Sequence, residues 1–330
     1  MRNKRKYKKK HVRRAARFYQ DELEQEINDD REAHGKKRFT PKKKDENDQR
    51  LTKESTTDPE SGYYVKGERE KQFAYSFHTA CDRNGFVLGT IVTPGNIHDS
   101  IILKPLLELI IHRFTVPFAV VADSTAPIAH LLLRQRILPV FPYTRPKGVK
   151  GMFKTNAFYY DAYYDCYLCE NDQQLVYRTT TREGRREYVS DPKICETCPF
   201  LERCTKSQTM QKVIHLHVWQ DAIDEVEHLR HTPVNRQLYA RRKETIERVF
   251  ADAKEKHGMR WTRYRGLKKV TMQAMLTFAA LNLKKLANWS WDSSRNPNGV
   301  SYFLRIHKTN PHFQVEMRVC LMYAINPYTD

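Results

Sequence analysis

A run of alternating strand and helix patterns between residues 73 and 143 constrains the fold more than any other feature of the sequence. It begins with two stretches of alternating apolar and polar residues, joined by a turn that carries the Asn84-Gly85 hairpin signal. The helix that follows begins near Asp99, a residue type that commonly caps helices. In chain order we expect strands at 73–81 and 86–93, a helix at 99–113, a strand at 117–123, a helix at 129–135 and a strand at 138–143. A hairpin followed by β-α units predicts an α/β protein with a mixed sheet and flanking helices.

The alternation of strands and helices stops after residue 144 and resumes as helices after residue 232. The segment between them is rich in Tyr, Thr, Lys and Cys and has the character of an insertion, and two long helices are expected beyond it, at 235–256 and 268–287. The predicted organisation is a basic and acidic tail with a linker at 1–62, the first part of the α/β core at 63–144, a cysteine-rich insertion at 145–232, helices that complete the core at 233–290 and a tail at 291–330. Residues 1–32 are expected to form either a charged helix or a solvated tail.

The charge balance points to a polyanionic partner. The chain has 58 Lys and Arg against 39 Asp and Glu, a formal net charge of +19, and nucleic acid is the first partner that such an excess suggests. Residues 260–269 (RWTRYRGLKK) interleave Trp261 and Tyr264 with basic side chains, as in surfaces that stack bases and hold phosphates. The alternative is a solvated basic face. No run of about 18 apolar residues occurs, so the sequence predicts no membrane span.

Asp123 is a candidate for metal chemistry. It follows the apolar residues 119–122 at the C-terminal end of a predicted strand, where open α/β sheets bind ligands and metals. The alternative is that Asp123 caps the next helix.

Glu247 is a second candidate, in the predicted helix 235–256. At about 100° per residue, Lys243 and Lys254 lie on the same side of this helix as Glu247, whereas Arg242 points elsewhere. Glu247 therefore borders an apolar stripe made of Ile246, Val249, Phe250 and Ala253. It could hold a divalent cation together with a distant Asp while the lysines bind phosphate, or it could belong to a surface Glu–Lys network.

Five of the seven cysteines cluster in the predicted insertion. Two Cys-x2-Cys pairs, Cys166 with Cys169 and Cys195 with Cys198, have the spacing of a tetrahedral zinc site, and Cys204 is a fifth possible ligand. The spacing predicts a structural Zn²⁺ in a zinc-ribbon-like subdomain. The alternative is a set of reduced thiols.

The same stretches resemble bacterial insertion-sequence transposases of the DDE type, in the branch with a cysteine-bearing insertion. The matching stretches are residues 73–100, 120–123, the helix with RRKETIERVFADAKEKHGMR, RYRGL at 263–267 and ALNLKKLANW at 280–289. The resemblance implies an RNase H-like catalytic core that cleaves and transfers DNA strands.

In such transposases, three carboxylates hold Mg²⁺ or Mn²⁺, and the resemblance assigns the second to Asp123 and the third to Glu247. It implies a cytoplasmic protein at the nucleoid, acting on element ends and target DNA as a homo-oligomer or together with an intact transposase. The residues that it implies for DNA binding are Tyr239, Lys243, Lys254, Arg260, Arg263 and Arg265.

One family carboxylate has no counterpart. The family's first acidic residue lies on the first strand of the sheet, just before a lysine-rich stretch, and this sequence begins at such a stretch, Asn3 to Lys6. We therefore expect an N-terminally truncated, poorly active copy whose sheet has a gap beside the hairpin 73–93. The alternatives are a non-catalytic DNA-binding remnant that inhibits an intact transposase, and a stand-alone zinc-binding nucleic-acid module.

Overall fold

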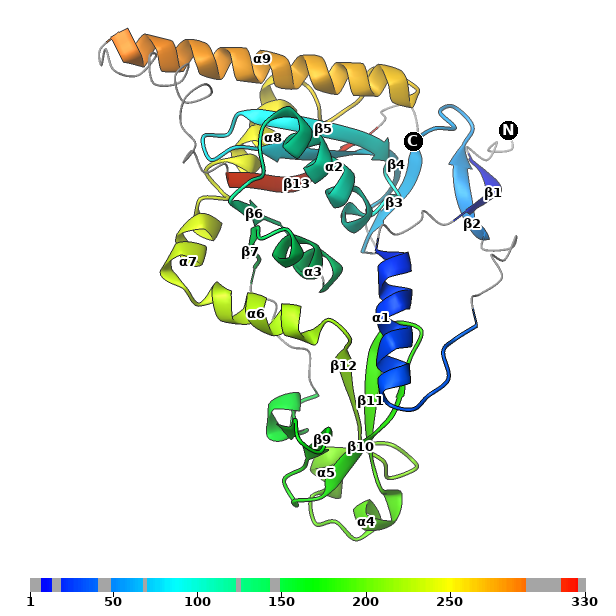
Figure 1. Cartoon of the computed structure of the whole chain (residues 1–330). Helices are drawn as coiled ribbons and strands as arrows, with labels where there is room; N and C mark the ends of the chain where they lie inside the picture. Colours follow the sequence, from blue (N-terminus) through cyan, green and yellow to red (C-terminus); the bar gives the residue numbers. More distant parts are fainter. Residues whose placement is uncertain are drawn as a thin grey trace. The chain divides into compact units, whose positions relative to one another are not determined.

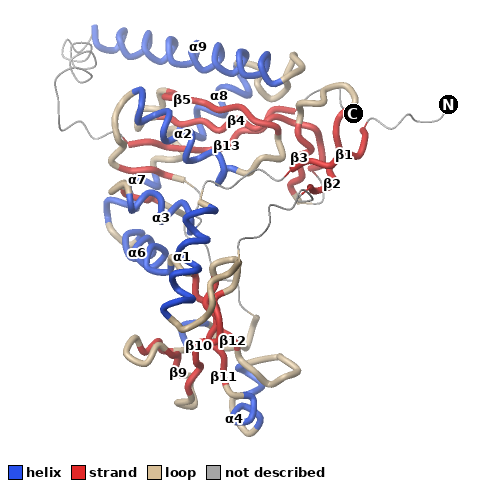
Figure 2. The backbone as a smooth tube through the Cα atoms, turned by 45° about the vertical axis from the view of Figure 1, so that its right-hand side comes forward, coloured by secondary structure: helices blue, strands red, loops and turns tan. Residues whose placement is uncertain are grey.

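The computed structural model describes residues 7–13, 19–40, 49–67, 70–122, 126–142, 149–294 and 316–325 (Figures 1 and 2). The chain divides into two compact units, each described by itself. Unit 1 comprises Met1–Phe18, Lys44–Pro142 and Asp224–Asp330, and unit 2 comprises Tyr19–Lys43 and Tyr143–Ile223. Helix α6 (Gln220–Arg230) spans the boundary between these two sets of residues.

Unit 1 contains a six-stranded mixed sheet flanked by helices. The hairpin predicted from the Asn-Gly signal is confirmed, with β4 antiparallel to β5 and Tyr75 opposite Pro94. Strands β6 and β7 are parallel, as β-α units require, so the predicted mixed α/β class is also confirmed. The strands are β3 (Gly62–Lys66), β4 (Glu70–Cys81), β5 (Val87–Pro94), β6 (Ala119–Val121), β7 (Leu138–Val140) and β13 (Glu316–Ile325).

Strand β13 corrects the expectation of a gap in this sheet. It lies between β4 and β6, antiparallel to β4 with Arg318 opposite Cys81, and parallel to β6 with Arg318 opposite Val121. The segment 291–330, predicted as a tail, therefore supplies an interior strand. The sequence pattern did not show this because strand pairing between segments far apart in the chain leaves no local periodicity.

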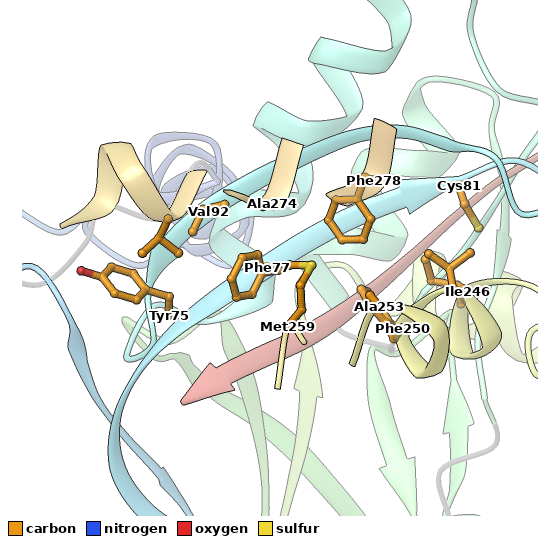
Figure 3. Packing of buried hydrophobic residues seen from close by; sticks show 12 residues of the cluster. Tyr75, Phe77, Cys81, Val92, Ile246, Phe250, Ala253, Met259, Ala274 and Phe278 are labelled. Carbon is orange, nitrogen blue, oxygen red and sulfur yellow. The ribbon is translucent and has the colours of Figure 1, made fainter. Parts of the chain in front are cut away.

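Helices cover both faces of the β4–β5 hairpin. Alternate residues of β4 point to opposite faces, and Tyr75, Phe77 and Cys81 lie in one buried cluster with α8 and α9 (Figure 3). On the other face, the His78 ring contacts Asp99 in the first turn of α2. The helices of unit 1 are α2 (Asp99–Arg113), α3 (Ala126–Arg134), α7 (Pro233–Ala240), α8 (Ile246–Lys256) and α9 (Leu267–Ser294).

The start of α2 differs from the expected cap. His98, not Asp99, is the N-cap residue, and its Nδ1 accepts a hydrogen bond from the Ser100 backbone N–H at 3.2 Å. The Asp99 carboxylate instead lies 3.0 Å from Nδ1 of His78, a buried residue of β4. Asp99, which the local sequence indicated as the helix cap, therefore contacts His78 of a neighbouring strand instead.

The segment 1–62, predicted as a tail and linker, contains regular structure. Strands β1 (Tyr7–Arg13) and β2 (Gln49–Ser55) pair antiparallel in unit 1, with Tyr7 opposite Ser55. Helix α1 (Gln20–Ala33) lies in unit 2. The high charge of this segment therefore did not prevent it from forming regular secondary structure.

Unit 2 is built on a five-stranded antiparallel sheet in the order β12-β11-β10-β9-β8. Its core contains the fully buried Leu175 and Tyr188, together with Phe158, Tyr167 and Ile214. The strands are β8 (Tyr159–Asp161), β9 (Cys166–Leu168), β10 (Gln174–Thr180), β11 (Arg185–Ser190) and β12 (Val213–His217), and the short helices are η1 (Thr155–Ala157), α4 (Pro192–Glu196) and α5 (Leu201–Cys204).

Polar contacts attach the charged helix α1 to this sheet. The Arg186 Nε atom donates to the buried Asp30 carboxylate at 2.6 Å, and Arg31 donates to the Thr180 carbonyl at 3.0 Å. Leu23 and Ile27 pack with Trp219. A helix with few apolar residues is thus ordered by a buried ion pair and a small apolar contact.

Candidate functional site

The strand that leads to Asp123 lies inside the sheet of unit 1. Residues Ala119, Val120 and Val121 of β6 are buried, and the strand has β13 on one side and β7 on the other. The Ala122 N–H donates to the Val140 carbonyl at 3.2 Å. Asp123 itself lies outside the described residues, so its role stays a prediction.

Glu247 lies in the first turn of α8, not in the middle of a long helix. The helix predicted over 235–256 is two helices, α7 and α8, separated by a turn at residues 241–245. The buried Thr245 closes this turn, because its hydroxyl donates to the Arg241 carbonyl at 2.9 Å. The sequence of the turn contains good helix formers and no Gly or Pro, so only packing reveals the break.

The two helices separate because they pack on different strands. In α7, Leu238 and Tyr239 pack with Ala119, Val121 and Val140 of β6 and β7. In α8, the predicted apolar stripe is confirmed, and it lies in the cluster with β4, β5 and α9 rather than with β6 (Figure 3). Burial of each large apolar side chain of this stripe contributes about 1.5–3 kcal/mol, which holds the start of α8 and hence Glu247 in place.

Arg242 lies close to the Glu247 carboxylate. Its Nε atom lies 3.8 Å from Glu247 Oε1, and the Glu247 side chain is 49% exposed. Arg242 was expected to point elsewhere, and this is wrong because the turn at 241–245 removes the helical phase on which the angle was calculated. For the same reason Lys243, an exposed residue of the turn, does not have the predicted helical angle to Glu247, whereas Lys254 shares α8 with it.

Residues 260–266 form an exposed basic and aromatic loop before α9, which we call the basic loop. Trp261 and Tyr264 are each 46% exposed, and Arg260, Arg263 and Arg265 are also exposed. The buried Thr262 braces the loop by donating to the Tyr264 carbonyl at 2.8 Å. Aromatic faces and guanidinium groups are thus open to solvent together.

A buried carboxylate anchors the end of the basic loop. Asp58 accepts hydrogen bonds from the Tyr75 hydroxyl at 2.9 Å and from the Gly266 N–H at 3.2 Å, and the neighbouring Glu60 accepts from the Leu267 N–H at the start of α9. Burial and the Asp58 carboxylate both raise the pKa of Tyr75, which keeps its hydroxyl a donor. Asp58 lies in the segment predicted as a tail and linker, and the sequence carried no signal for this anchoring.

Asn282 of α9 joins the helix to the edge of the sheet. Its side-chain oxygen accepts from the Val87 N–H at 2.8 Å, and its side-chain NH₂ donates to the Val87 carbonyl at 2.9 Å. Both backbone groups of Val87 are thereby satisfied by a side chain of the ALNLKK stretch. Hydrogen bonding to the β5 backbone is a structural role for this Asn.

Four cysteines of unit 2 line one small pocket. They are Cys169, Cys195, Cys198 and Cys204, and Cys166 is not among the residues around it. Burial raises the pKa of Cys204, the nearby Lys212 lowers it, and the thiols of Cys195, Cys169 and Cys198 raise it further. All six cysteines whose side chains are described are free thiols.

Within the described ranges, no three His, Cys, Asp or Glu side chains are arranged closely enough to hold a metal ion. Over the same part of the chain, no helix is both long and apolar enough to cross a bilayer.

Comparisons with known proteins identify one family. Residues 168–287 match a family model described as a transposase DDE domain, and this range contains Glu247 and the basic loop. Neither a curated protein nor a solved structure matches the chain. The family match confirms the resemblance to DDE transposases.

Proposed function

We propose that the chain cleaves and transfers DNA strands at the ends of an insertion sequence, because residues 168–287 match a transposase DDE domain. Glu247 supports the proposal, because it lies in the matched range with its carboxylate half exposed at the start of α8. Asp123 is proposed as its partner, directly beyond the interior strand β6. The mixed sheet with helices on both faces agrees with an RNase H-like core.

DNA is the proposed partner of the basic loop. Its exposed Arg260, Arg263 and Arg265 would contact phosphates, and Trp261 and Tyr264 would contact sugar or base faces. Further proposed contacts are Tyr239, beside β6, and Lys243 and Lys254, on either side of Glu247 in the chain. A protein with a net charge of +19 and this function would lie at the nucleoid in the cytoplasm, as one of several copies or together with an intact transposase.

Divalent metal is the proposed cofactor, and Glu247 fits one of its ligands. An accessible carboxylate oxygen is the donor that Mg²⁺ and Mn²⁺ prefer, and the Arg242 Nε atom lies 3.8 Å from this carboxylate. When bound, such ions activate the attacking hydroxyl and stabilise the leaving oxygen in phosphoryl transfer. Arg242 would balance the charge of Glu247 and orient its carboxylate, while Asp123 would supply the second set of oxygens.

A second candidate function is DNA binding without cleavage, as an inhibitor of an intact transposase. It requires only the exposed basic and aromatic side chains of the basic loop, and no metal ligands.

Cleavage assays distinguish the two functions. If the chain is an active transposase, it nicks DNA with Mg²⁺ or Mn²⁺, and Glu247→Gln or Asp123→Asn lowers the rate by at least about 10²-fold, because each removes a charged metal ligand. Asp252→Asn is the matched control on the same helix, because Asp252 pairs with Lys256, which is not a proposed DNA contact, and this variant should cleave like the unchanged chain. Equal cleavage by all variants would contradict the site, and tight DNA binding without cleavage would support the inhibitor.

DNA binding should depend strongly on salt. If six to ten phosphates are contacted, the affinity for duplex DNA measured by fluorescence anisotropy should fall by roughly 10³–10⁵ between 50 and 200 mM salt. Arg263→Ala should reduce the slope of log K against log salt by about 1. Arg38→Ala is the control, because that guanidinium already pairs with Asp29 and Glu32, and it should leave the slope unchanged. Binding that does not depend on salt would rule out the phosphate contacts.

A further inference from the structure

The pocket of unit 2 brings together four thiols from three short segments. Cys169 follows β9, Cys195 and Cys198 lie in and after α4, and Cys204 ends α5. The rest of the lining combines apolar residues, among them Phe158 and Leu175, with polar ones, among them Glu170 and Asp191. Four thiols around one pocket are the donor set of a closed structural zinc site.

Tight turns present each of these cysteines. The Cys169 N–H donates to the Gln173 carbonyl at 3.0 Å, and the Cys169 carbonyl accepts from the Asp172 N–H at 2.9 Å, which closes the β9–β10 turn. The Cys198 N–H donates to the Cys195 carbonyl at 3.1 Å, and the Cys204 N–H donates to the Phe200 carbonyl at 2.9 Å. Short turns that carry two cysteines three positions apart are typical of thiolate ligands to zinc.

A cation already lies beside this group. The Lys212 ammonium donates to the Cys204 carbonyl at 2.9 Å and interacts electrostatically with the Cys204 thiol. Four thiolates around one Zn²⁺ carry a net charge of −2, so a neighbouring ammonium group would stabilise the loaded site. Cys204 is also the thiol that interacts with all three of the others.

Cys166 has different surroundings. It is buried within β9, where it pairs with Val176, and its electrostatic neighbours are Asp161 and Asp165 rather than thiols. A thiolate next to two carboxylates is disfavoured, so Cys166 is a poor ligand.

We propose that Cys169, Cys195, Cys198 and Cys204 bind one structural Zn²⁺, and that Cys166 is not a ligand. Sequence spacing alone indicated Cys166 as the fourth thiolate ligand. The surroundings of Cys166 and Cys204 indicate that the fourth ligand is Cys204 instead. In the described residues the four thiols do not yet form a group close enough to hold a metal, so binding requires them to move together. Binding releases the thiol protons to solvent as four Zn–S bonds form.

Metal analysis of the full chain tests the proposal. Protein purified without chelators should contain about one zinc per chain, and X-ray absorption should show four sulfur neighbours at about 2.3 Å. The single substitutions Cys169→Ala, Cys195→Ala, Cys198→Ala and Cys204→Ala should each lower the retained zinc at least about fivefold after dialysis against a competing chelator. Cys166→Ala and Cys81→Ala are the matched controls, and both should keep the full zinc content.

Two results would overturn this assignment. One is protein that takes up no zinc even when zinc is supplied in excess. The other is loss of zinc from Cys166→Ala but not from Cys204→Ala, which would restore the assignment from spacing. If a variant fails to fold, alkylation of the unchanged chain with and without chelator remains decisive. Chelation should expose the four proposed ligands to the reagent and leave the reactivity of Cys166 unchanged, and any other pattern would contradict the proposal.

Discussion

Removal of residues 316–330 is expected to unfold unit 1. Strand β13 pairs with β4 over Arg318–Ile325 and with β6 over Glu316–Arg318, so its loss exposes two backbone edges in the middle of the sheet. Unpaired buried backbone groups each cost about 1–3 kcal/mol, and several of them together exceed the usual stability of a domain. The shortened chain should aggregate, or unfold without a cooperative transition, when followed by circular dichroism in urea.

Two matched changes distinguish the contribution of β13 to stability from that of the rest of the C-terminal segment. A chain that ends at residue 325 keeps every pair of the β13 register and should unfold like the full chain. Arg318 has a partner strand on both sides, so Arg318→Pro removes a ladder hydrogen bond, whereas Arg318→Ala leaves the backbone intact. Equal stability of the Pro and Ala variants would show that β13 does not hold this position in solution.

Asp58→Ala is expected to destabilise unit 1 by about 3–5 kcal/mol. The substitution leaves the buried Tyr75 hydroxyl and the Gly266 N–H without this acceptor, and each such loss costs about 1–3 kcal/mol. It also frees the end of the basic loop, so DNA affinity should fall even at temperatures where the sheet stays folded. Urea denaturation followed by intrinsic fluorescence measures the first effect.

A double-mutant cycle tests the cause of that loss. In a Tyr75→Phe background the hydroxyl is already gone, so Asp58→Ala should cost at least about 1 kcal/mol less than it does in the unchanged chain. Glu108→Ala, at an exposed position of α2, is the surface control and should change the free energy of unfolding by less than about 0.5 kcal/mol. An additive cycle would show that the hydroxyl–carboxylate contact contributes nothing.

Local patterns in the sequence correctly identified the elements whose signals are short-ranged. The Asp82–Gly85 turn specifies the β4–β5 hairpin because Gly85 adopts the positive φ of 80° that the turn needs, and the Asp82 carboxylate accepts from the Asn84 and Phe86 N–H groups. The apolar stripe of α8 is buried as its 3.6-residue period requires. The basic loop is exposed because guanidinium groups at that density cannot be buried without partners. The family resemblance, which also depends on local motifs, is confirmed by the match to the transposase DDE domain.

Tertiary packing decided what no local pattern encodes. The break between α7 and α8 occurs because the two helices pack on different strands. As a result Arg242, and not the expected Lys243, is the neighbour of Glu247. The place of β13 depends on backbone pairing, which is available to any extended segment that reaches a vacant edge. The thiol pocket depends on which cysteines the turns of unit 2 bring together, and spacing along the chain does not measure that distance. The sequence by itself determined the family, the α/β class and the basic surface, while the neighbours of each candidate site residue were determined only when distant segments packed together.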